Sequence, residues 1–189
     1  MMTRQYKNDW FTANIPYFEK LLDKTKIKNV LEIGSYEGLS TNYIFDNYPD
    51  AIVTCIDNWE SGFEYIEAKI DMKPVYDRFL SNTKEHSSRL EILKGYSADQ
   101  LIKINHRRDF YDFVYVDGNH TSKGCYFDMV IALSVLKEGG IMAIDDYDWP
   151  TFASDGTRPK EAIDLFLERN DVILLEKSYQ VWIQKKITG

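Results

Sequence analysis

The fold is indicated first by a strand-to-helix turn at residues 31–41, which reads LEIGSYEGLST. Gly34 and Gly38 bracket the turn, and Ser40 and Thr41 lie in the first turn of the helix that follows. Glycine allows a tight turn and lets a ligand approach the backbone closely. We therefore expect a ligand-binding loop at the carboxyl end of a β-strand.

Strands and helices alternate along the rest of the chain. Short apolar runs predict strands at Asn29–Ile33, Ile52–Ile56, Leu90–Lys94, Phe113–Val116, Gly140–Ile144, Val172–Leu175 and Gln180–Gln184. Helical periodicity predicts helices at Leu39–Asn47, Val75–Lys84, Ser122–Leu136 and Arg158–Glu168. This alternation indicates an α/β fold, in which helices cover both faces of a mostly parallel sheet. The connection Glu176–Tyr179 is too short for a parallel crossover, so the last two strands should form an antiparallel hairpin.

An amphipathic segment precedes the first strand. Phe11, Ile15, Phe18 and Leu22 recur at helical spacing and share one face. This segment either packs against the sheet or forms a lid over a ligand. A chain of 189 residues suits one domain. We expect that domain to consist of a helical cap over residues 1–27 and a core over residues 28–189. The irregular aromatic stretch at residues 59–70 is predicted to be neither helix nor strand.

The composition limits the class of protein and the type of partner. The chain is 44% hydrophobic and 28% charged, as in soluble globular proteins. No apolar run approaches the roughly 20 residues that span a bilayer. The N-terminus MMTRQYKNDWF lacks the apolar core of a signal peptide, so we expect a cytoplasmic protein. A net charge of −7 without any basic block argues against nucleic acid as the partner. Cys55 and Cys125 lack metal-site spacing and are expected to be buried structural thiols.

The residues of the first loop restrict its ligand. A dinucleotide fingerprint would require glycine where Tyr36 and Leu39 stand, so NAD and FAD are disfavoured. Glu32, just before the loop, would repel a phosphate but attract an ammonium or sulfonium group. Asp57 ends the second strand, where an acid binds ribose hydroxyls in doubly wound folds. These features favour an adenosine-bearing ligand with positive charge and no phosphate, and S-adenosylmethionine meets that description.

Three motifs in order carry a family resemblance. The pattern ExGxxxGxS at residues 32–40, an acid after the second strand and GYS at residues 95–97 resemble class I S-adenosylmethionine-dependent methyltransferases. The fuller pattern E-x-G-x-Y-x-G-x-S is similar to catechol O-methyltransferase and to small metal-dependent sugar and antibiotic O-methyltransferases. The resemblance covers roughly residues 28–150. It implies a Rossmann-like, seven-stranded sheet of order 3-2-1-4-5-7-6.

The same resemblance implies a set of cofactor-binding residues. These are Glu32, Gly34, Tyr36, Gly38 and Ser40 at the methionine end, Asp57 on the ribose and Ser97 beside the adenine. Each polar member also has a structural alternative. Ser40 could be an ordinary residue of the first helical turn, Asp57 a turn residue, and Ser97 a helix cap.

Polar residues also end the fourth and fifth expected strands, in VYVDGNH at residues 114–120 and IDD at residues 144–146. Neighbouring strands lie about 4.8 Å apart, and their carboxyl ends open on the ligand crevice. Asp117, Asp145 and Asp146 would therefore meet, and a divalent cation would relieve their repulsion. All-oxygen ligation suits Mg²⁺, with Mn²⁺ or Ca²⁺ as alternatives.

Adjacent strand residues point to opposite faces, so Asp145 and Asp146 can share one ion only if the strand turns there. In the alternative, Asp145 ends the strand and Asp146 bonds local backbone amides.

His120 lies three residues after Asp117. In the resembling enzymes a basic side chain at this offset is the proposed general base, and histidine titrates near neutrality. Some sugar-modifying relatives carry an acid at the position of Asn119 instead, and the amide here cannot accept a proton. The resemblance therefore implies catalytic roles for His120 and Asp117. The alternative for His120 is helix capping or simple exposure.

Together these residues predict a divalent-metal-dependent O-methyltransferase acting on a hydroxyl of a small molecule or sugar. The loop Tyr147–Arg158, with Trp149 and Phe152, either walls the acceptor site or packs down on the protein. Two other interpretations remain: a metal-independent N- or C-methyltransferase, and a non-catalytic S-adenosylmethionine-binding partner subunit.

Overall fold

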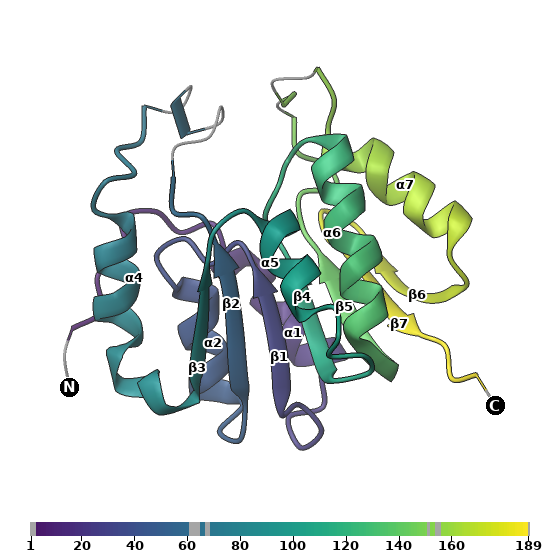
Figure 1. Ribbon diagram of the computed structural model, residues 1–189, viewed down its shortest axis with the longest axis horizontal. Helices are drawn as coiled ribbons and strands as arrows, with labels where there is room; N and C mark the ends of the chain where they lie inside the picture. Colours follow the sequence, from purple (N-terminus) through teal and green to yellow (C-terminus); the bar gives the residue numbers. More distant parts are fainter. Residues whose placement is uncertain (1–2, 61–64, 67–68, 151, 154–155, 189) are drawn as a thin grey trace.

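The computed structural model describes residues 3–60, 65–66, 69–150, 152–153 and 156–188. A seven-stranded sheet forms its centre, in the order β3-β2-β1-β4-β5-β7-β6 (Figure 1). The strands are β1 (Asn29–Ile33), β2 (Ile52–Asp57), β3 (Leu90–Lys94), β4 (Tyr111–Val116), β5 (Leu136–Ile144), β6 (Val172–Lys177) and β7 (Val181–Lys185). Strands β1 to β5 pair in parallel, whereas β7 runs antiparallel to both β5 and β6. The predicted order and the antiparallel hairpin are therefore confirmed.

Helices cover both faces of the sheet. They are α1 (Ile15–Leu21), α2 (Leu39–Asn47), α4 (Val75–Thr83), α5 (Ser97–Ile104), α6 (Ser122–Val135) and α7 (Pro159–Arg169), with 3-10 turns at η1 (Thr12–Asn14) and η2 (Lys84–Arg89). The apolar residues of α5, α6 and α7 join one hydrophobic cluster, and those of α1, α2 and α4 join another. In the part of the chain that the structure describes, no helix is both long and apolar enough to cross a membrane.

The central strands contribute to both clusters because successive side chains alternate between the two faces. In β4, Val114 and Val116 join the cluster of α5, α6 and α7, whereas Phe113 and Tyr115 join the other. A strand buried on both faces has no polar side, which explains its continuous apolar run. Cys55 and Cys125 are buried free thiols, as expected.

The N-terminal segment packs against the sheet. Phe18 of α1 is completely buried and makes edge-to-face contacts with Phe113 and Trp182, at centroid distances of 5.4 and 5.1 Å. Such aromatic contacts add to the free energy gained by burying the rings. Of the two alternatives for this segment, the structure therefore shows a helix docked on the sheet.

The carboxyl ends of four strands are aligned in one row. Ile33 is in register with both Ile56 and Val116, and Val116 is in register with Ile144. The ladder continues one residue further, since Asp117 N donates to Ile33 O at 2.8 Å and Asp145 N donates to Val116 O at 2.9 Å. The residues that follow these four strands therefore lie side by side at one edge of the sheet.

The two largest differences from the predicted elements are in β5 and α5. Strand β5 begins at Leu136 rather than Gly140, because Leu136 already pairs with Tyr111 of β4 before a shift in register that includes Gly139, whose φ is 73°. Helix α5 was not among the helices predicted from periodicity. It has only eight residues, and its buried apolar side chains are Leu101 and Ile104, too few to produce a clear period.

Candidate functional site

The loop after β1 is fixed by contact with the backbone after β4. Gly34 has a φ of 88°, and a β-carbon at this position would lie 1.8 Å from the carbonyl oxygen of Asp117. Gly34 N also donates to Ile56 O at 2.8 Å. Glycine is therefore required here by the close approach of two strand ends. Gly38 has a φ of 79° and forms the N-cap of α2.

Glu32 is completely buried beneath this loop. Its carboxylate accepts hydrogen bonds from the hydroxyls of Ser35 and Ser40, each at 2.6 Å, and from Thr41 at 2.5 Å. The Cys55 thiol donates to it at 3.2 Å. Burial raises the pKa of Glu32, and the hydroxyl donors oppose that rise. Glu32 and Ser40 thus bind each other and shape the loop, and their direct contact with a cofactor stays a prediction.

Asp57 holds the same loop from the end of β2. Its Oδ2 accepts from the backbone N–H groups of Ser35 at 2.9 Å and Tyr36 at 2.8 Å. Its Oδ1 accepts from Trp59 N at 2.7 Å. Burial raises the pKa of Asp57, although these donors favour the charged form. A carboxylate offers about four acceptor positions, so the predicted contact with ribose hydroxyls is compatible with this arrangement.

Tyr36 lies between the loop and the N-terminal segment. Its backbone has a φ of 45°, and its hydroxyl accepts from Asn8 Nδ2 at 2.9 Å. The rings of Trp10 and Tyr65 lie beside it, with centroid distances of 4.8 and 5.9 Å. Trp10 is 54% exposed, so the aromatic group is open to solvent. Sequence reasoning assigned no role to Asn8 or Trp10, and their only signal was a polar-aromatic stretch close to the N-terminus.

Ser97 begins α5, just beyond the end of β3. Asp128 of α6 approaches the same region and is 1% exposed. Burial raises the pKa of Asp128 to about 7, and the neighbouring Ser97 hydroxyl and Asn119 N–H oppose that rise. Asp128 was missed because one acid within an apolar helical stretch gives no motif. The placement of Ser97 by the adenine stays a prediction.

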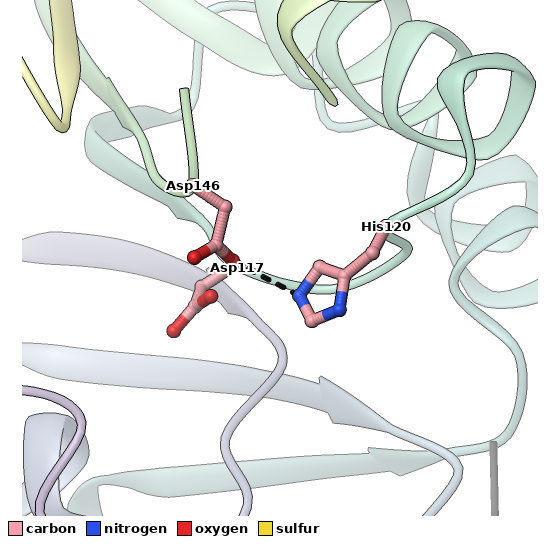
Figure 2. Close-up of side chains that lie close together, drawn as sticks. All are labelled: Asp117, His120 and Asp146. Atoms are coloured by element: carbon pink, nitrogen blue, oxygen red, sulfur yellow. Dashed lines mark ion pairs between the residues drawn. The ribbon is translucent and has the colours of Figure 1, made fainter. Parts of the chain in front are cut away.

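Three predicted site residues gather after β4 and β5. Figure 2 shows Asp117, His120 and Asp146 lying close together, and one ligand atom from each lies within 4.8 Å of the others. His120 Nε2 lies 3.0 Å from Asp146 Oδ2. Asp146 has a φ of 62°, which supplies the turn needed to bring it to the side of Asp117. The Tyr179 hydroxyl donates to Asp146 Oδ1 at 3.0 Å and holds that turn.

Asp145 is oriented differently. Its Oδ2 accepts from Asn14 Nδ2 at 2.8 Å, from Gln180 Nε2 at 2.7 Å and from the Tyr115 hydroxyl. Its Oδ1 accepts from Asp146 N at 2.9 Å. Asp145 is therefore outside the cluster of Asp117, His120 and Asp146 in this structure. Its predicted role as a metal ligand stays a prediction.

The electrostatics of the cluster favour a cation. Burial, together with repulsion from Asp145 and Asp146, raises the pKa of Asp117 well above its usual range. Burial and the charge of Asp146 raise the pKa of Asp145 to about 6. Carboxylates this close repel one another, and a divalent cation removes that cost. The donor set of Asp117, Asp146 and His120 therefore fits a divalent metal ion.

The loop after β5 contributes an aromatic contact to the cluster. Trp149 packs edge-to-face against the His120 ring, with a centroid distance of 3.7 Å. Phe152 is 53% exposed, and the Arg158 guanidinium lies 5.0 Å from its ring centroid. Residues 151, 154 and 155 of this loop lie outside the described residues, so the predicted acceptor wall is described only in part.

Known methyltransferases have sequences similar to that of this chain. A family model described as "Methyltransferase domain" matches residues 31–147. The chain is 25% identical over 152 residues to "Probable caffeoyl-CoA O-methyltransferase 3" of Dictyostelium discoideum. That match covers 77% of this chain and 51% of the relative, so the chain spans about half the length of that curated protein.

Solved structures share the fold at low sequence identity. Cofactor-bound Rv0187 from MTB superposes with a TM-score of 0.70 at 13% identity, covering 96% of this chain and 84% of that one. MycE methyltransferase from the mycinamycin biosynthetic pathway, in complex with Mg, SAH and mycinamycin VI, gives 0.61 at 18% identity, covering 97% and 51%. An O-methyltransferase family protein from Burkholderia thailandensis gives 0.62 at 14% identity, covering 92% and 56%.

These structural likenesses show a common fold, and the sequence match is more specific. The family model spans more than half of the 189 residues and includes the β1 loop, Asp57, Asp117 and Asp146. The chain therefore belongs to the methyltransferase domain family.

Proposed function

We propose that this protein is an S-adenosylmethionine-dependent O-methyltransferase that requires a divalent cation and methylates a hydroxyl group of a small molecule or sugar. The observation that carries the proposal is the gathering of Asp117, Asp146 and His120 at the sheet edge beside the β1 loop. The similarity to a caffeoyl-CoA O-methyltransferase supports oxygen as the methyl acceptor. The MycE complex, which contains Mg, SAH and mycinamycin VI, supports a cation and a small-molecule substrate.

The cofactor would lie across the ends of β1 and β2. Asp57 and Glu32 fix the loop between them through backbone and hydroxyl donors, so the loop is formed before the ligand arrives. A preformed loop reduces the ordering cost of binding. The spare acceptor positions of Asp57 would take ribose hydroxyls, and Ser97 would lie toward the adenine. Glu32 and the other buried acids would favour a sulfonium ligand over an anionic one.

The acceptor hydroxyl would lie at the adjacent ends of β4 and β5. Asp117 and Asp146 would hold the cation, which when bound would orient the acceptor oxygen and lower the pKa of its hydroxyl. Because the β1 and β4 ends are hydrogen-bonded neighbours, a cofactor and an acceptor bound there would be within reach of each other. Positioning of this kind contributes much of the rate acceleration in a bimolecular transfer. Trp149 would help to exclude water from this edge of the site.

The proposal is tested first by calorimetry with S-adenosylhomocysteine, with and without Mg²⁺ or Mn²⁺. A screen of phenols, catechols and sugars with radiolabelled S-adenosylmethionine would follow, in the presence of each metal and in excess chelator. We expect binding of S-adenosylhomocysteine and methylation of a hydroxyl that chelator abolishes. Absence of S-adenosylhomocysteine binding would overturn the cofactor assignment. Methylation of amines or carbon acceptors that persists in chelator would favour a metal-independent enzyme.

A matched pair of variants tests the metal ligands. Asp117→Asn should lower metal-dependent turnover by at least about 100-fold, because even outer-shell partners of metal ligands cost 10- to 100-fold when removed. Asp148→Asn changes an acid of the loop after β5 whose side chain is 57% exposed, and it should leave turnover unchanged. Equal activity of the two variants would refute the proposed role of Asp117.

A further inference from the structure

We propose that Asp128 of α6 is a positioning residue of the cofactor site, which fixes the Ser97 hydroxyl as a hydrogen-bond acceptor toward the purine and thereby selects adenine over a 6-oxopurine. The inference rests on the proposed function and adds a source of base selectivity to it. It concerns the segments that follow β3 and β4 on the side of α5 and α6.

Asp128 is an acid buried among apolar side chains. It is 1% exposed, and within the part of the chain that the structure describes neither of its oxygens makes a hydrogen bond of ordinary length and angle. Its buried neighbours on α6 include Cys125, Met129 and Ala132. A carboxylate in such surroundings destabilises the fold, whereas an apolar side chain of the same size does not. Fold stability therefore gives no reason for an acid at this position.

Two hydrogen-bond donors adjoin the carboxylate. The Ser97 hydroxyl and the backbone N–H of Asn119 both oppose the rise that burial causes in the pKa of Asp128. Gly118 also adjoins the carboxylate, since a β-carbon on that glycine would lie 3.5 Å from Oδ2. Asp128 therefore connects the segment after β3 with the segment after β4. A small approach of these two segments would complete both hydrogen bonds.

The segment after β3 lies next to the proposed ribose site. Gly95 N donates to Asp57 O at 2.9 Å, so the ends of β2 and β3 are hydrogen-bonded neighbours. A β-carbon on Gly95 would lie 2.4 Å from Nε2 of Gln100, which donates to Lys94 O at 3.2 Å. These contacts fix the turn that leads to Ser97. A nucleoside whose ribose binds Asp57 would therefore have its base within reach of Ser97.

The carboxylate determines which role the Ser97 hydroxyl takes. A hydroxyl has one proton and two lone pairs, so a hydroxyl that donates to Asp128 can only accept a hydrogen bond from a ligand. Ser97 is partly exposed, so a ligand can reach its oxygen. The C6 substituent of adenine is an amino group and donates, whereas that of hypoxanthine is a carbonyl oxygen and repels an acceptor. A fixed acceptor rejects such an analogue, because the polar groups are left unpaired when the complex forms.

The test compares S-adenosylhomocysteine with its 6-oxo analogue, S-inosylhomocysteine, by calorimetry at pH 8. The wild type should bind the adenosine compound at least about 10-fold more tightly. Asp128→Leu removes the acceptor and frees the Ser97 proton, so this ratio of affinities should fall to about 3-fold or less. Asp99→Asn changes an exposed acid in the first turn of α5 and should leave the ratio unchanged.

A double-mutant cycle shows whether Asp128 acts through Ser97. Ser97→Ala should lower the ratio as much as Asp128→Leu, and the double variant should lower it no further, because the two effects share one hydroxyl. Circular dichroism and urea unfolding should show that Asp128→Leu is folded and at least as stable at pH 8 as the wild type. Asp128→Asn keeps the shape of the side chain and repeats the test if the leucine variant does not fold. Its amide retains one acceptor, so the ratio should be intermediate.

The outcomes separate the inference from the proposed function. A wild type that binds the two compounds equally, an unchanged ratio in the Asp128 variants, or additive effects in the double variant would overturn the inference and leave the proposed function standing. Failure of the wild type to bind S-adenosylhomocysteine would overturn both.

Discussion

Replacing Gly34 by alanine should destabilise the protein much more than the same replacement at Gly139. Both glycines have positive φ angles, 88° and 73°, so both changes force alanine into the left-handed region. The surroundings differ. An added β-carbon at Gly34 would lie 1.8 Å from Asp117 O, whereas at Gly139 the nearest atom is a flexible methyl of Ile187 at 3.7 Å. The comparison therefore separates the cost of the backbone angle from the cost of crowding.

The magnitude follows from the hydrogen bonds at the row of strand ends. The left-handed conformation alone costs about 1–2 kcal/mol, which is the full effect expected for Gly139→Ala. At Gly34 the ends of β1 and β4 must also move apart by about 1 Å or more to relieve the overlap. That movement stretches the 2.8 Å bond from Asp117 N to Ile33 O, and an unsatisfied buried group costs about 1–3 kcal/mol. Gly34→Ala should therefore cost about 2–5 kcal/mol.

Urea unfolding followed by circular dichroism measures both variants against the wild type. The free energy of unfolding is extrapolated to water, and similar slopes would show that the unfolded states are comparable. Gly34→Ala should also weaken binding of S-adenosylhomocysteine, whereas Gly139→Ala should not. Equal destabilisation of the two variants would refute the reasoning, because it would show that contact between the loop and Asp117 carries no cost.

Two further predictions concern buried acids. Asp57→Asn places an amide NH2, which cannot accept a hydrogen bond, against backbone N–H groups of Ser35, Tyr36 or Trp59. The change should lower the free energy of unfolding by about 1–3 kcal/mol. It should also weaken S-adenosylhomocysteine binding by about 10-fold or more, as calorimetry would show. Unchanged affinity would exclude Asp57 as the organiser of the loop. Burial raises the pKa of Asp128 from 3.8 to about 7, so its contribution to stability is present below pH 3.8 and is lost as the pH rises through 7. Asp128→Asn should remove this dependence, worth up to about 4 kcal/mol, when unfolding is measured between pH 4 and pH 8. Parallel pH profiles for wild type and variant would contradict the assigned shift.

Much of the fold follows from local sequence patterns. Helix α2 occupies the predicted residues Leu39–Asn47, because Gly38, with a φ of 79°, marks its start. Strands β1 and β3 also have their predicted bounds. The early part of β5 could not be predicted from the same patterns, since two consecutive glycines at 139 and 140 are more often a turn than the interior of a strand.

The location of the candidate site could be predicted from the sequence, but the directions of its side chains could not. The positions of Asp117 and Asp146 follow from the ends of two neighbouring strands. The partners of Asp145 do not, because Asn14 and Gln180 lie 131 and 35 residues away in sequence. The left-handed turn at Asp146 likewise depends on the distant Tyr179 hydroxyl. Side-chain direction at a strand end is set by tertiary partners that no local pattern specifies.

The contact between Gly34 and Asp117 has a thermodynamic consequence. The loop that would bind the cofactor and the strand end that would bind the cation share a backbone junction with no free space between them. A shift of the backbone at either Gly34 or Asp117 must therefore move the backbone at the other residue. By linkage, if the cofactor changes the affinity of the protein for the cation by some factor, the cation must change its affinity for the cofactor by the same factor. In this protein that reciprocity would pass through a single pair of neighbouring strands, without any hinge or domain movement.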